Sequence, residues 1–294
     1  MITSNLTGTG VAIITPFRND GSIDFNALHN LVDYIITNKV DYLVVLGTTG
    51  ESVTLSTDEK NAVISNVIES VANRVPIIVG IGGNNTNEIV QKIRNTDFTG
   101  ISALMSVAPY YNKPNQRGLY LHYKAIAENS PVPVIMYNVP GRTASNISAE
   151  TTIKLANDFK NIIGIKEASG NFYQVMEIIK NRPQNFLVIS GDDATALPFI
   201  ALGANGLISV LGNALPMQVS ELVRKSLEHN FTEAQKIQYS ILDVMNAMFE
   251  DGNPAGIKAA LQIKGLIKAN LRLPMVPVEE KLYQKIELLI KKLN

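Results

Sequence analysis

The fold is decided by the stretch Ile162-Ile163-Gly164-Ile165-Lys166-Glu167-Ala168-Ser169. Its β-branched residues, followed by Gly170 and Asn171, predict a buried strand that ends at a turn. Alternation puts Ile162, Gly164 and Lys166 on one face, so Gly164 predicts open space beneath the lysine. Burial disfavours an ammonium ion and favours the neutral amine, a nucleophile that forms Schiff bases with carbonyl compounds. The alternative is a lysine with a buried stem and a solvated charge.

Seven further apolar runs of similar length are also predicted as strands, and helical patterns separate them. These runs are Val11–Ile14, Tyr42–Leu46, Pro76–Gly80, Ile101–Ser106, Val132–Tyr137, Phe186–Gly191 and Gly206–Val210. Strands that alternate with helices form parallel βαβ units. Eight such units in a chain of 294 residues predict an α/β protein with a closed (β/α)8 TIM barrel rather than an open sheet.

The helices are predicted from their caps and from apolar residues at helical spacing. They comprise a helix capped by Asp24, helices from Thr57 and Thr86, helices over Leu119–Glu128, Ser148–Asn157 and Ala196–Leu202, and one after Pro216. Three more are expected over Thr232–Phe249, after Pro254 and over Glu279–Leu293. We therefore divide the chain into a barrel domain, residues 1–230, and a C-terminal helical region, residues 231–294.

The composition is that of a globular protein with a large core, since 46% of the residues are hydrophobic and 18% are charged. Lys and Arg number 26, as do Asp and Glu, and this balance argues against nucleic acid or a membrane as partner. The absence of cysteine excludes disulfides and thiolate sites. Residues 1–5 lack a signal-peptide pattern, and no apolar run reaches the ~20 residues that span a bilayer, so we expect a cytoplasmic protein.

A barrel of this kind carries its catalytic groups at the carboxyl ends of its strands and in the loops that follow. Seven unusual residues end a predicted strand or follow one: Thr48, Thr49, Tyr110, Tyr111, Tyr137, Lys166 and Gly191. They therefore fall on one rim, which a lysine that merely reaches solvent does not predict.

Each candidate also has a structural interpretation. Tyr137 is a phenol placed for proton transfer or a core aromatic. Gly47–Gly50 is a plain turn, or it presents N–H groups to a carboxylate ahead of a helix. Arg142, in a Pro-Gly loop, is solvated or binds a carboxylate through two hydrogen bonds. Tyr110 and Tyr111 belong to a site or simply pack.

The sequence offers little support for a metal site or a nucleotide-binding site. The histidines, His29, His122 and His229, lie far apart, and no HExxH motif occurs. Asp192 and Asp193 suit a divalent ion, but capping of a helix is the stronger interpretation. Neither the dinucleotide fingerprint nor the P-loop pattern is present. We therefore expect neither a metal nor a cofactor.

Four segments together resemble a known family: Gly47–Ser52 (GTTGES), Pro109–Asn112 (PYYN), Tyr137–Thr143 (YNVPGRT) and Gly164–Ser169 (GIKEAS). They are similar to the pyruvate-dependent class I aldolases, and above all to the 4-hydroxy-tetrahydrodipicolinate synthase family, also called dihydrodipicolinate synthases. The resemblance extends from Gly8 to Met275. The combination is highly specific, although GTTG alone would not be.

The resemblance implies a lyase that condenses pyruvate with L-aspartate 4-semialdehyde on the diaminopimelate route to lysine. Lys166 would form the Schiff base with pyruvate. Tyr137, Thr48 and Tyr111 would relay protons, with Tyr111 supplied by a neighbouring subunit. The family is usually a homotetramer built from two tight dimers.

The resemblance also implies which residues hold the substrates. Thr49 and the adjacent loop backbone would bind the carboxylate of pyruvate. Arg142 would receive the carboxylate of the semialdehyde. Gly191 and Ile208 would line the pocket through their backbones.

In lysine-inhibited members of this family, lysine binds at the dimer interface beside the active site. This chain matches that site at Ser52, Asn84, Glu88 and Tyr110. It departs at Val53, Thr57 and Lys60. A cationic Lys60 would repel the side-chain ammonium of the ligand by about 3 kcal/mol at a separation of ~5 Å. The departures predict weak or absent inhibition by lysine.

Two alternative functions stay open at the level of sequence. N-acetylneuraminate lyases and 2-keto-3-deoxy sugar acid aldolases share the lysine and the tyrosine, but they resemble the chain less at Gly141–Thr143. A catalytically silent paralogue would bind a keto acid as a sensor. Retention of Lys166, Tyr137, Thr48 and Tyr111 argues against that silent form.

Overall fold

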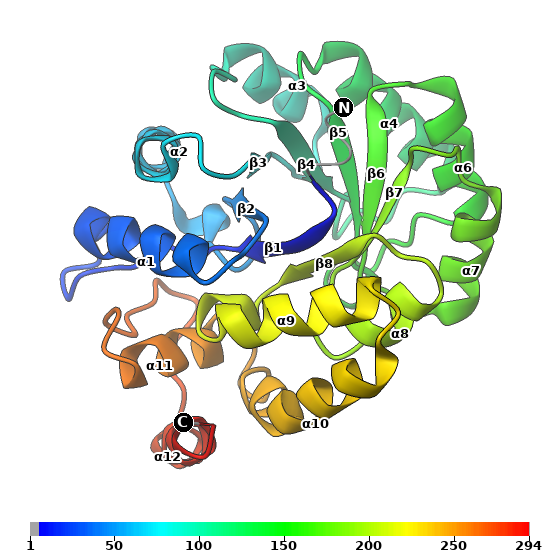
Figure 1. Ribbon diagram of the computed structural model, residues 1–294. Helices are drawn as coiled ribbons and strands as arrows, with labels where there is room; N and C mark the ends of the chain where they lie inside the picture. The colour runs from blue at the N-terminus through cyan, green and yellow to red at the C-terminus, as the bar shows by residue number, and fades with distance from the viewer. Residues whose placement is uncertain (1–5, 294) are drawn as a thin grey trace.

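The computed structural model describes residues 6–293, in which the strands form a closed parallel barrel in sequence order (Figure 1). The predicted (β/α)8 fold is confirmed. The strands are β1 (Gly8–Ala12), β2 (Tyr42–Val45), β3 (Ile77–Gly80), β4 (Ala103–Val107), β5 (Val134–Asn138), β6 (Ile162–Glu167), β7 (Leu187–Ser190) and β8 (Gly206–Ser209). Residues 1–5, which bear on the prediction of a cytoplasmic protein, lie outside the described residues.

Helices surround the barrel on its outer side (Figure 1). They are α1 (Phe25–Thr37), α2 (Thr57–Val71), α3 (Thr86–Asn95), α4 (Gln116–Asn129), α5 (Pro140–Thr143), α6 (Ala149–Asp158), α7 (Phe172–Asn181), α8 (Ala196–Ala201), α9 (Pro216–Leu227), α10 (Phe231–Ala247), α11 (Ala255–Ile263) and α12 (Glu280–Lys291), with short 3-10 helices η2 (Ser52–Thr54) and η3 (Leu211–Asn213). Within residues 6–293, no helix has the length and apolar character needed to cross a membrane.

The predicted helix starts at Asp24, Thr57 and Thr86 are confirmed. The Asp24 side chain accepts a hydrogen bond from the backbone of α1, at 3.1 Å. A reciprocal capping box between Ser56 and Glu59 begins α2. Local side-chain chemistry therefore fixes where these helices begin.

Other boundaries differ from the prediction. β1 begins at Gly8 and ends at Ala12, whereas an apolar run predicted Val11–Ile14. Gly8 pairs with Gly206 of β8, although glycines give no apolar signal. Two helices lie outside the predicted set, the single turn α5 and the longer α7. Asn171, which the sequence indicated only as a turn residue, caps α7 through its side chain.

The face assignment within β6 is wrong at one end. The ladder with β5 passes over Ile163, which makes a β-bulge and shifts the alternation of side chains. Ile162 therefore packs in the cluster between strands and helices, and Ile163 contacts the cluster inside the barrel. The open space predicted at Gly164 is absent, because a Cβ there would lie 2.8 Å from the Cβ of Leu187.

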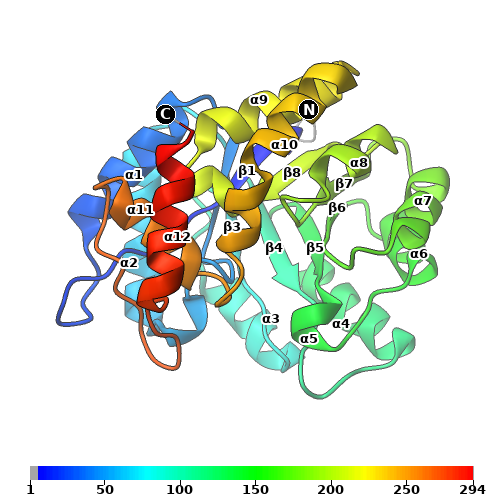
Figure 2. The same cartoon turned by 90° about the horizontal axis from the view of Figure 1, so that it is seen from below.

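The C-terminal helical region packs on the outside of the barrel. Figures 1 and 2 place α10, α11 and α12 together on the side where α1 and α9 lie. Ile241 and Ile257 from this region share one hydrophobic cluster with Val11 and Leu43 of the barrel strands. The boundary proposed at residue 230 falls just before α10. The two parts are joined by a common core.

A buried ion pair ties this region to the turn after β2. The Lys258 ammonium on α11 lies 2.5 Å from the Glu51 carboxylate, and both side chains are buried. Lys258 also donates to the carbonyl oxygen of Asn270 at 2.8 Å, and Glu51 accepts from the Arg272 N–H at 3.1 Å. Burial, opposed by the charge of Glu51, lowers the pKa of Lys258 to about 8. The pair fixes the turn that leads from β2 to α2.

We expect Lys258→Met to lower the free energy of unfolding by about 3–5 kcal/mol, because Glu51 is then buried without its counter-charge. The double variant Lys258→Met/Glu51→Gln should lose less than the sum of the two single losses, since no unpaired charge remains. Urea denaturation of all three variants measures this coupling. Lys281→Met, on the exposed side of α12, is the control. Strictly additive losses would contradict the coupling.

Candidate active site

Lys166 and Tyr137 lie side by side on adjacent strands at the carboxyl end of the barrel. They are partners in the ladder between β6 and β5. Both side chains are buried, with exposed fractions of 5% and 7%. The Lys166 ammonium lies 4.3 Å from the centroid of the Tyr137 ring, a cation–π contact. The predicted pairing of a buried amine with a phenol at one rim is therefore found.

Gly191, which follows β7, lies against the stem of this lysine. A Cβ at Gly191 would be 3.0 Å from Cε of Lys166 and 2.7 Å from Cβ of Ala168. A larger residue would have to displace the lysine side chain. The glycine therefore leaves room for the stem of the lysine side chain.

Polar residues on the outer faces of the same strands hold this register. Asn138, next to Tyr137, donates from Nδ2 to both carboxylate oxygens of Glu167, at 3.2 and 3.0 Å. Glu167, next to Lys166, also accepts from the Ser169 N–H at 2.7 Å. Neither Asn138 nor Glu167 was predicted as a site residue, although each stands beside one in the sequence.

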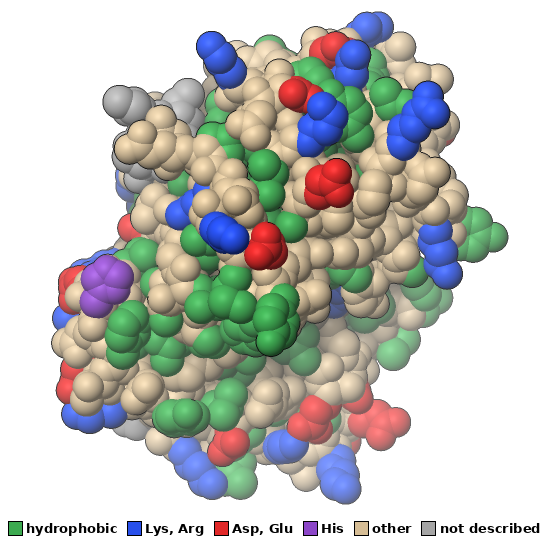
Figure 3. Space-filling view, turned by 90° about the vertical axis from the view of Figure 1, so that its right-hand side faces the viewer, with side chains coloured by type: hydrophobic (Ala, Val, Ile, Leu, Met, Phe, Trp, Pro, Cys, Tyr) green, Lys and Arg blue, Asp and Glu red, His purple; other side chains and the backbone are tan. Residues whose placement is uncertain are grey.

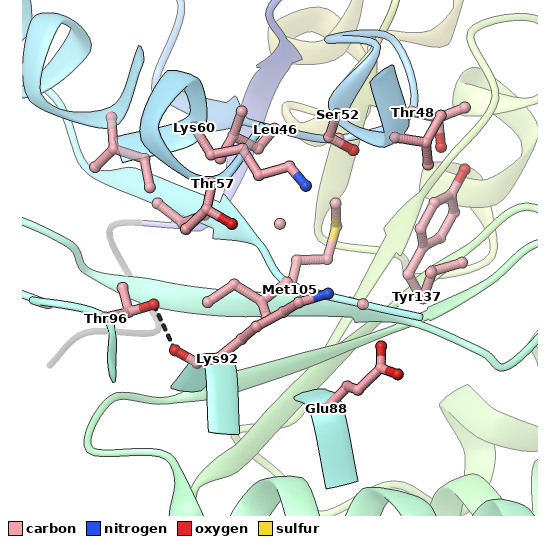
Figure 4. A pocket seen from close by; sticks show the side chains of 18 of the residues that line it. Leu46, Thr48, Ser52, Thr57, Lys60, Glu88, Lys92, Thr96, Met105 and Tyr137 are labelled. Atoms are coloured by element: carbon pink, nitrogen blue, oxygen red, sulfur yellow. Dashed lines mark hydrogen bonds between the residues drawn. The ribbon is translucent and has the colours of Figure 1, made fainter. Parts of the chain in front are cut away.

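The turn after β2 presents Thr48 and hides Thr49. Thr48 is exposed, and Figure 4 shows it beside the hydroxyl end of Tyr137. The Thr49 hydroxyl is buried and accepts from Nδ2 of Asn253 at 2.9 Å. Within the part of the chain that the structure describes, the N–H groups of Thr48 and Thr49 donate to no acceptor. The turn therefore offers two free N–H donors, while the Thr49 side chain is already engaged.

The role of Asn253, which holds the Thr49 hydroxyl, was not predicted from the sequence. Asn253 stands 204 positions from Thr49 in the chain. No motif or spacing connects the two, and only the packing of the C-terminal region on the barrel brings them together.

A cavity of about 1010 Å³ opens between α2, α3 and the ends of the central strands (Figure 4). Residues predicted for the active site line it, namely Thr48, Tyr137 and Arg142. Residues that match the lysine-binding site of the family line it as well, namely Ser52, Glu88 and Tyr110. Six predicted site residues lie outside this lining: Thr49, Asn84, Tyr111, Lys166, Gly191 and Ile208. Lys166 lies against the ring of Tyr137, and Ile208 is fully buried inside the barrel.

Arg142 occupies a helical turn rather than the loop that the sequence predicted. Pro140 begins α5, and its fixed φ angle suits the first position of a helix. The Thr143 hydroxyl donates to the carbonyl oxygen of Ser145 at 2.9 Å and so closes the turn. The guanidinium is therefore carried to the cavity by an ordered segment.

Tyr111 and Asn84 stand apart from the cavity lining. Tyr111 is 87% exposed and has a left-handed backbone, with φ of 71°. Asn84 donates from Nδ2 to the carbonyl oxygen of Tyr110 at 3.3 Å and accepts from Asn112 at 2.9 Å. One chain alone therefore does not bring Tyr111 to the Lys166–Tyr137 pair.

The acidic pair after β7 has a structural role. Asp193 is buried and accepts from the Ser209 hydroxyl and from the Val210 N–H, the latter at 2.9 Å. Burial raises its pKa, and these hydrogen bonds oppose the rise. Asp192 accepts from the Ala194 N–H at 2.9 Å in the turn before α8. Among the described residues, no group of three His, Cys, Asp or Glu side chains could hold a metal ion.

The charges on the cavity wall favour anionic ligands. Three cations, Lys60, Lys92 and Arg142, line it against a single carboxylate, Glu88. An excess of one sign in a concave site raises the local concentration of oppositely charged molecules. The cavity thus suits substrates that carry carboxylates.

The chain is similar to known proteins over nearly its whole length. Residues 5–293 match the model of the Dihydrodipicolinate synthetase family. A 4-hydroxy-tetrahydrodipicolinate synthase of Parabacteroides distasonis is 50% identical over 290 residues, 99% of this chain and 98% of that protein. The crystal structure of dihydrodipicolinate synthase from Aquifex aeolicus matches with a TM-score of 0.95 and 40% identity, covering 98% of each chain. The chain therefore belongs to the dihydrodipicolinate synthetase family.

Proposed function

We propose that the protein is a Schiff-base lyase that condenses pyruvate with L-aspartate 4-semialdehyde, the reaction of 4-hydroxy-tetrahydrodipicolinate synthases. One observation carries this proposal: a buried lysine amine lies 4.3 Å from the ring centroid of Tyr137 at the carboxyl end of the barrel. Family membership narrows the carbonyl substrate to pyruvate. The product would enter the diaminopimelate route to lysine.

Lys166 is the proposed nucleophile. Its neutral amine attacks C2 of pyruvate, and loss of water gives the Schiff base. Loss of a proton from C3 gives an enamine, which attacks the aldehyde carbon of the second substrate. The amine of that substrate then attacks C2, closes the ring and releases Lys166. The lysine is thus regenerated in each cycle.

Tyr137, Thr48 and Tyr111 are the proposed proton carriers. Tyr137 lies against the amine, and Thr48 stands beside the end of its ring (Figure 4). A phenol positioned in this way can take up the proton lost at C3 and return a proton to the alkoxide. Tyr111 would complete the relay from a second copy of the chain.

The carboxylates of the two substrates have separate proposed partners. The free N–H groups of Thr48 and Thr49 suit the pyruvate carboxylate, because two adjacent donors make an anion-binding turn. Arg142 suits the carboxylate of the semialdehyde through two parallel hydrogen bonds. Gly191 and Ile208 would line the pocket beside Lys166 through their backbones.

A homo-oligomer, with a homotetramer as the expected form, completes the proposal. Exposed apolar side chains support it, since Val53 is 83% exposed and Tyr111 87%. Figure 3 views the side where α6 and α7 lie and shows patches of hydrophobic side chains. Phe172, Tyr173 and Met176, all in α7, are exposed large hydrophobic residues. Large apolar groups of this kind are typical of subunit contacts. A cytoplasmic location stays a prediction from the sequence.

Borohydride reduction in the presence of pyruvate should inactivate the enzyme and leave one reduced pyruvate on Lys166. Tryptic mass spectrometry locates the adduct. Lys166→Ala should remain folded, gain no adduct and lose most of its turnover, whereas Lys160→Ala, at an exposed position, should behave as the wild type. An adduct on another lysine, or a wild-type protein that traps pyruvate without condensing it, would argue against the proposed reaction.

Arg142→Ala should raise KM for L-aspartate 4-semialdehyde by about 10- to 100-fold, because a charge-assisted hydrogen-bonded contact contributes about 1.5–3 kcal/mol. KM for pyruvate should stay nearly constant. Steady-state kinetics with each substrate varied in turn separates the two effects. Arg117→Ala, which removes an exposed charge from α4, is the matched control. Equal rises in both KM values would show that Arg142 does not bind the carboxylate of the semialdehyde specifically.

Tyr111→Phe should lower kcat by about 10²–10⁴-fold, the usual contribution of a positioned proton carrier. If Tyr111 acts across an interface, mixing this variant with Lys166→Ala should restore activity, since a mixed dimer contains one site with both residues intact. The assay is the activity of the two inactive variants after joint refolding. Failure to restore activity in a confirmed mixed oligomer would place Tyr111 outside the neighbouring site.

A further inference from the structure

The part of the cavity between α2 and α3 is built differently from the part beside Tyr137. One wall is formed by α2, and the facing wall by α3. The α2 wall contributes Thr57, Lys60, Asn61 and Ile64, and the facing wall contributes Gln91, Lys92 and Asn95 of α3 with Thr96 just after it. Apart from the two lysines and the apolar Ile64, these side chains are neutral and polar. The groove therefore has a cationic centre set among hydrogen-bonding groups.

The two lysines face each other across this groove. Figure 4 shows the ammonium groups of Lys60 and Lys92 directed into the same space from opposite walls. Lys60 is half-buried. Its burial, and then the charge of Lys92, lower the pKa of Lys60. A shared space between like charges favours an anion that touches both.

Neither lysine is neutralised by the protein. In residues 6–293, no carboxylate lies within 4.0 Å of either ammonium. Glu88 stands four positions before Lys92, the spacing and order that favour an ion pair on a helix. Its carboxylate instead accepts from Nδ2 of Asn85 at 3.0 Å. Lys92 therefore keeps its charge available to the groove.

Other lysines on helices of this protein are paired at the same spacing. Lys154 lies 2.9 Å from Asp158, and Lys291 lies 2.9 Å from Glu287. Some helical lysines of this chain are thus neutralised by a carboxylate one turn away, whereas the two lysines in the groove face each other.

We propose that Lys60 and Lys92 form a binding site for a small dianion that carries carboxylate or phosphate oxygens. Two fixed positive charges match two negative charges on one ligand, and the neutral side chains around them supply hydrogen-bond donors. A ligand with a cationic side chain would meet the same two charges and be repelled. Glu88 lies farther along the cavity, toward Tyr137, and does not occupy the space between the lysines (Figure 4).

Isothermal titration calorimetry of the full-length protein tests this site. Succinate and inorganic phosphate are the two probes, each titrated at ionic strength held constant with sodium chloride, because exposed charges are screened by salt. Saturable binding of at least one probe is expected. The probe that saturates at lower concentration identifies the class of dianion. No saturable binding of either probe would overturn the proposal.

Variants assign the binding to the groove. Lys60→Gln and Lys92→Gln should each weaken the binding at least tenfold, and Lys60→Arg, which keeps the charge, should retain it. Lys180→Gln is the matched control, since Lys180, like Lys92, is an exposed lysine in the last turn of its helix. Circular dichroism confirms that each variant is folded.

Two results would contradict the assignment. Unchanged affinity in both glutamine variants would place the ligand elsewhere, for instance at Arg142. Tighter binding of L-lysine than of either dianion would show that the groove selects cationic ligands. Because calorimetry measures binding alone, these outcomes are independent of whether Lys166 forms a Schiff base.

Discussion

The contact between the Lys166 ammonium and the face of the Tyr137 ring is the interaction on which the site depends. It exists because the barrel closes with parallel strands in sequence order, so β5 and β6 are neighbours and their carboxyl ends meet at one rim. The hydrogen bonds from Asn138 to Glu167 hold the two strands in register from the outside. Gly191 leaves room for the lysine stem. A buried amine beside a phenol suits Schiff-base chemistry.

The second requirement is a fixed turn after β2, and the protein meets it with residues far away in sequence. The Thr49 hydroxyl is bonded to Asn253, and Glu51 is paired with Lys258. Both partners belong to the C-terminal helical region, which shares the core of the barrel. That region therefore contributes to the geometry of the site, because it holds the turn that carries Thr48 and Thr49.

The sequence predicted the elements whose signals are local. Apolar runs that alternate with capped helices predicted the barrel. Lys166 and Tyr137 were predicted as site residues because each ends a predicted strand. Features that depend on contacts between distant segments were not predicted. The bulge at Ile163 arises from the register with β5, and it reverses the face expected for Ile162. Asn253 and Lys258 carry no motif, and the helical turn at Arg142 looked like a loop because Pro and Gly are typical of loops.

A crystal structure of the protein grown with pyruvate would test the Schiff base at Lys166 most directly. We expect continuous electron density from Nζ of Lys166 to C2 of pyruvate. The pyruvate carboxylate should accept hydrogen bonds from the N–H groups of Thr48 and Thr49, and the Tyr137 hydroxyl should lie within reach of C3. Pyruvate bound away from Lys166, or bound there without a covalent link in an enzyme that is active in the same crystals, would contradict a Schiff base at Lys166.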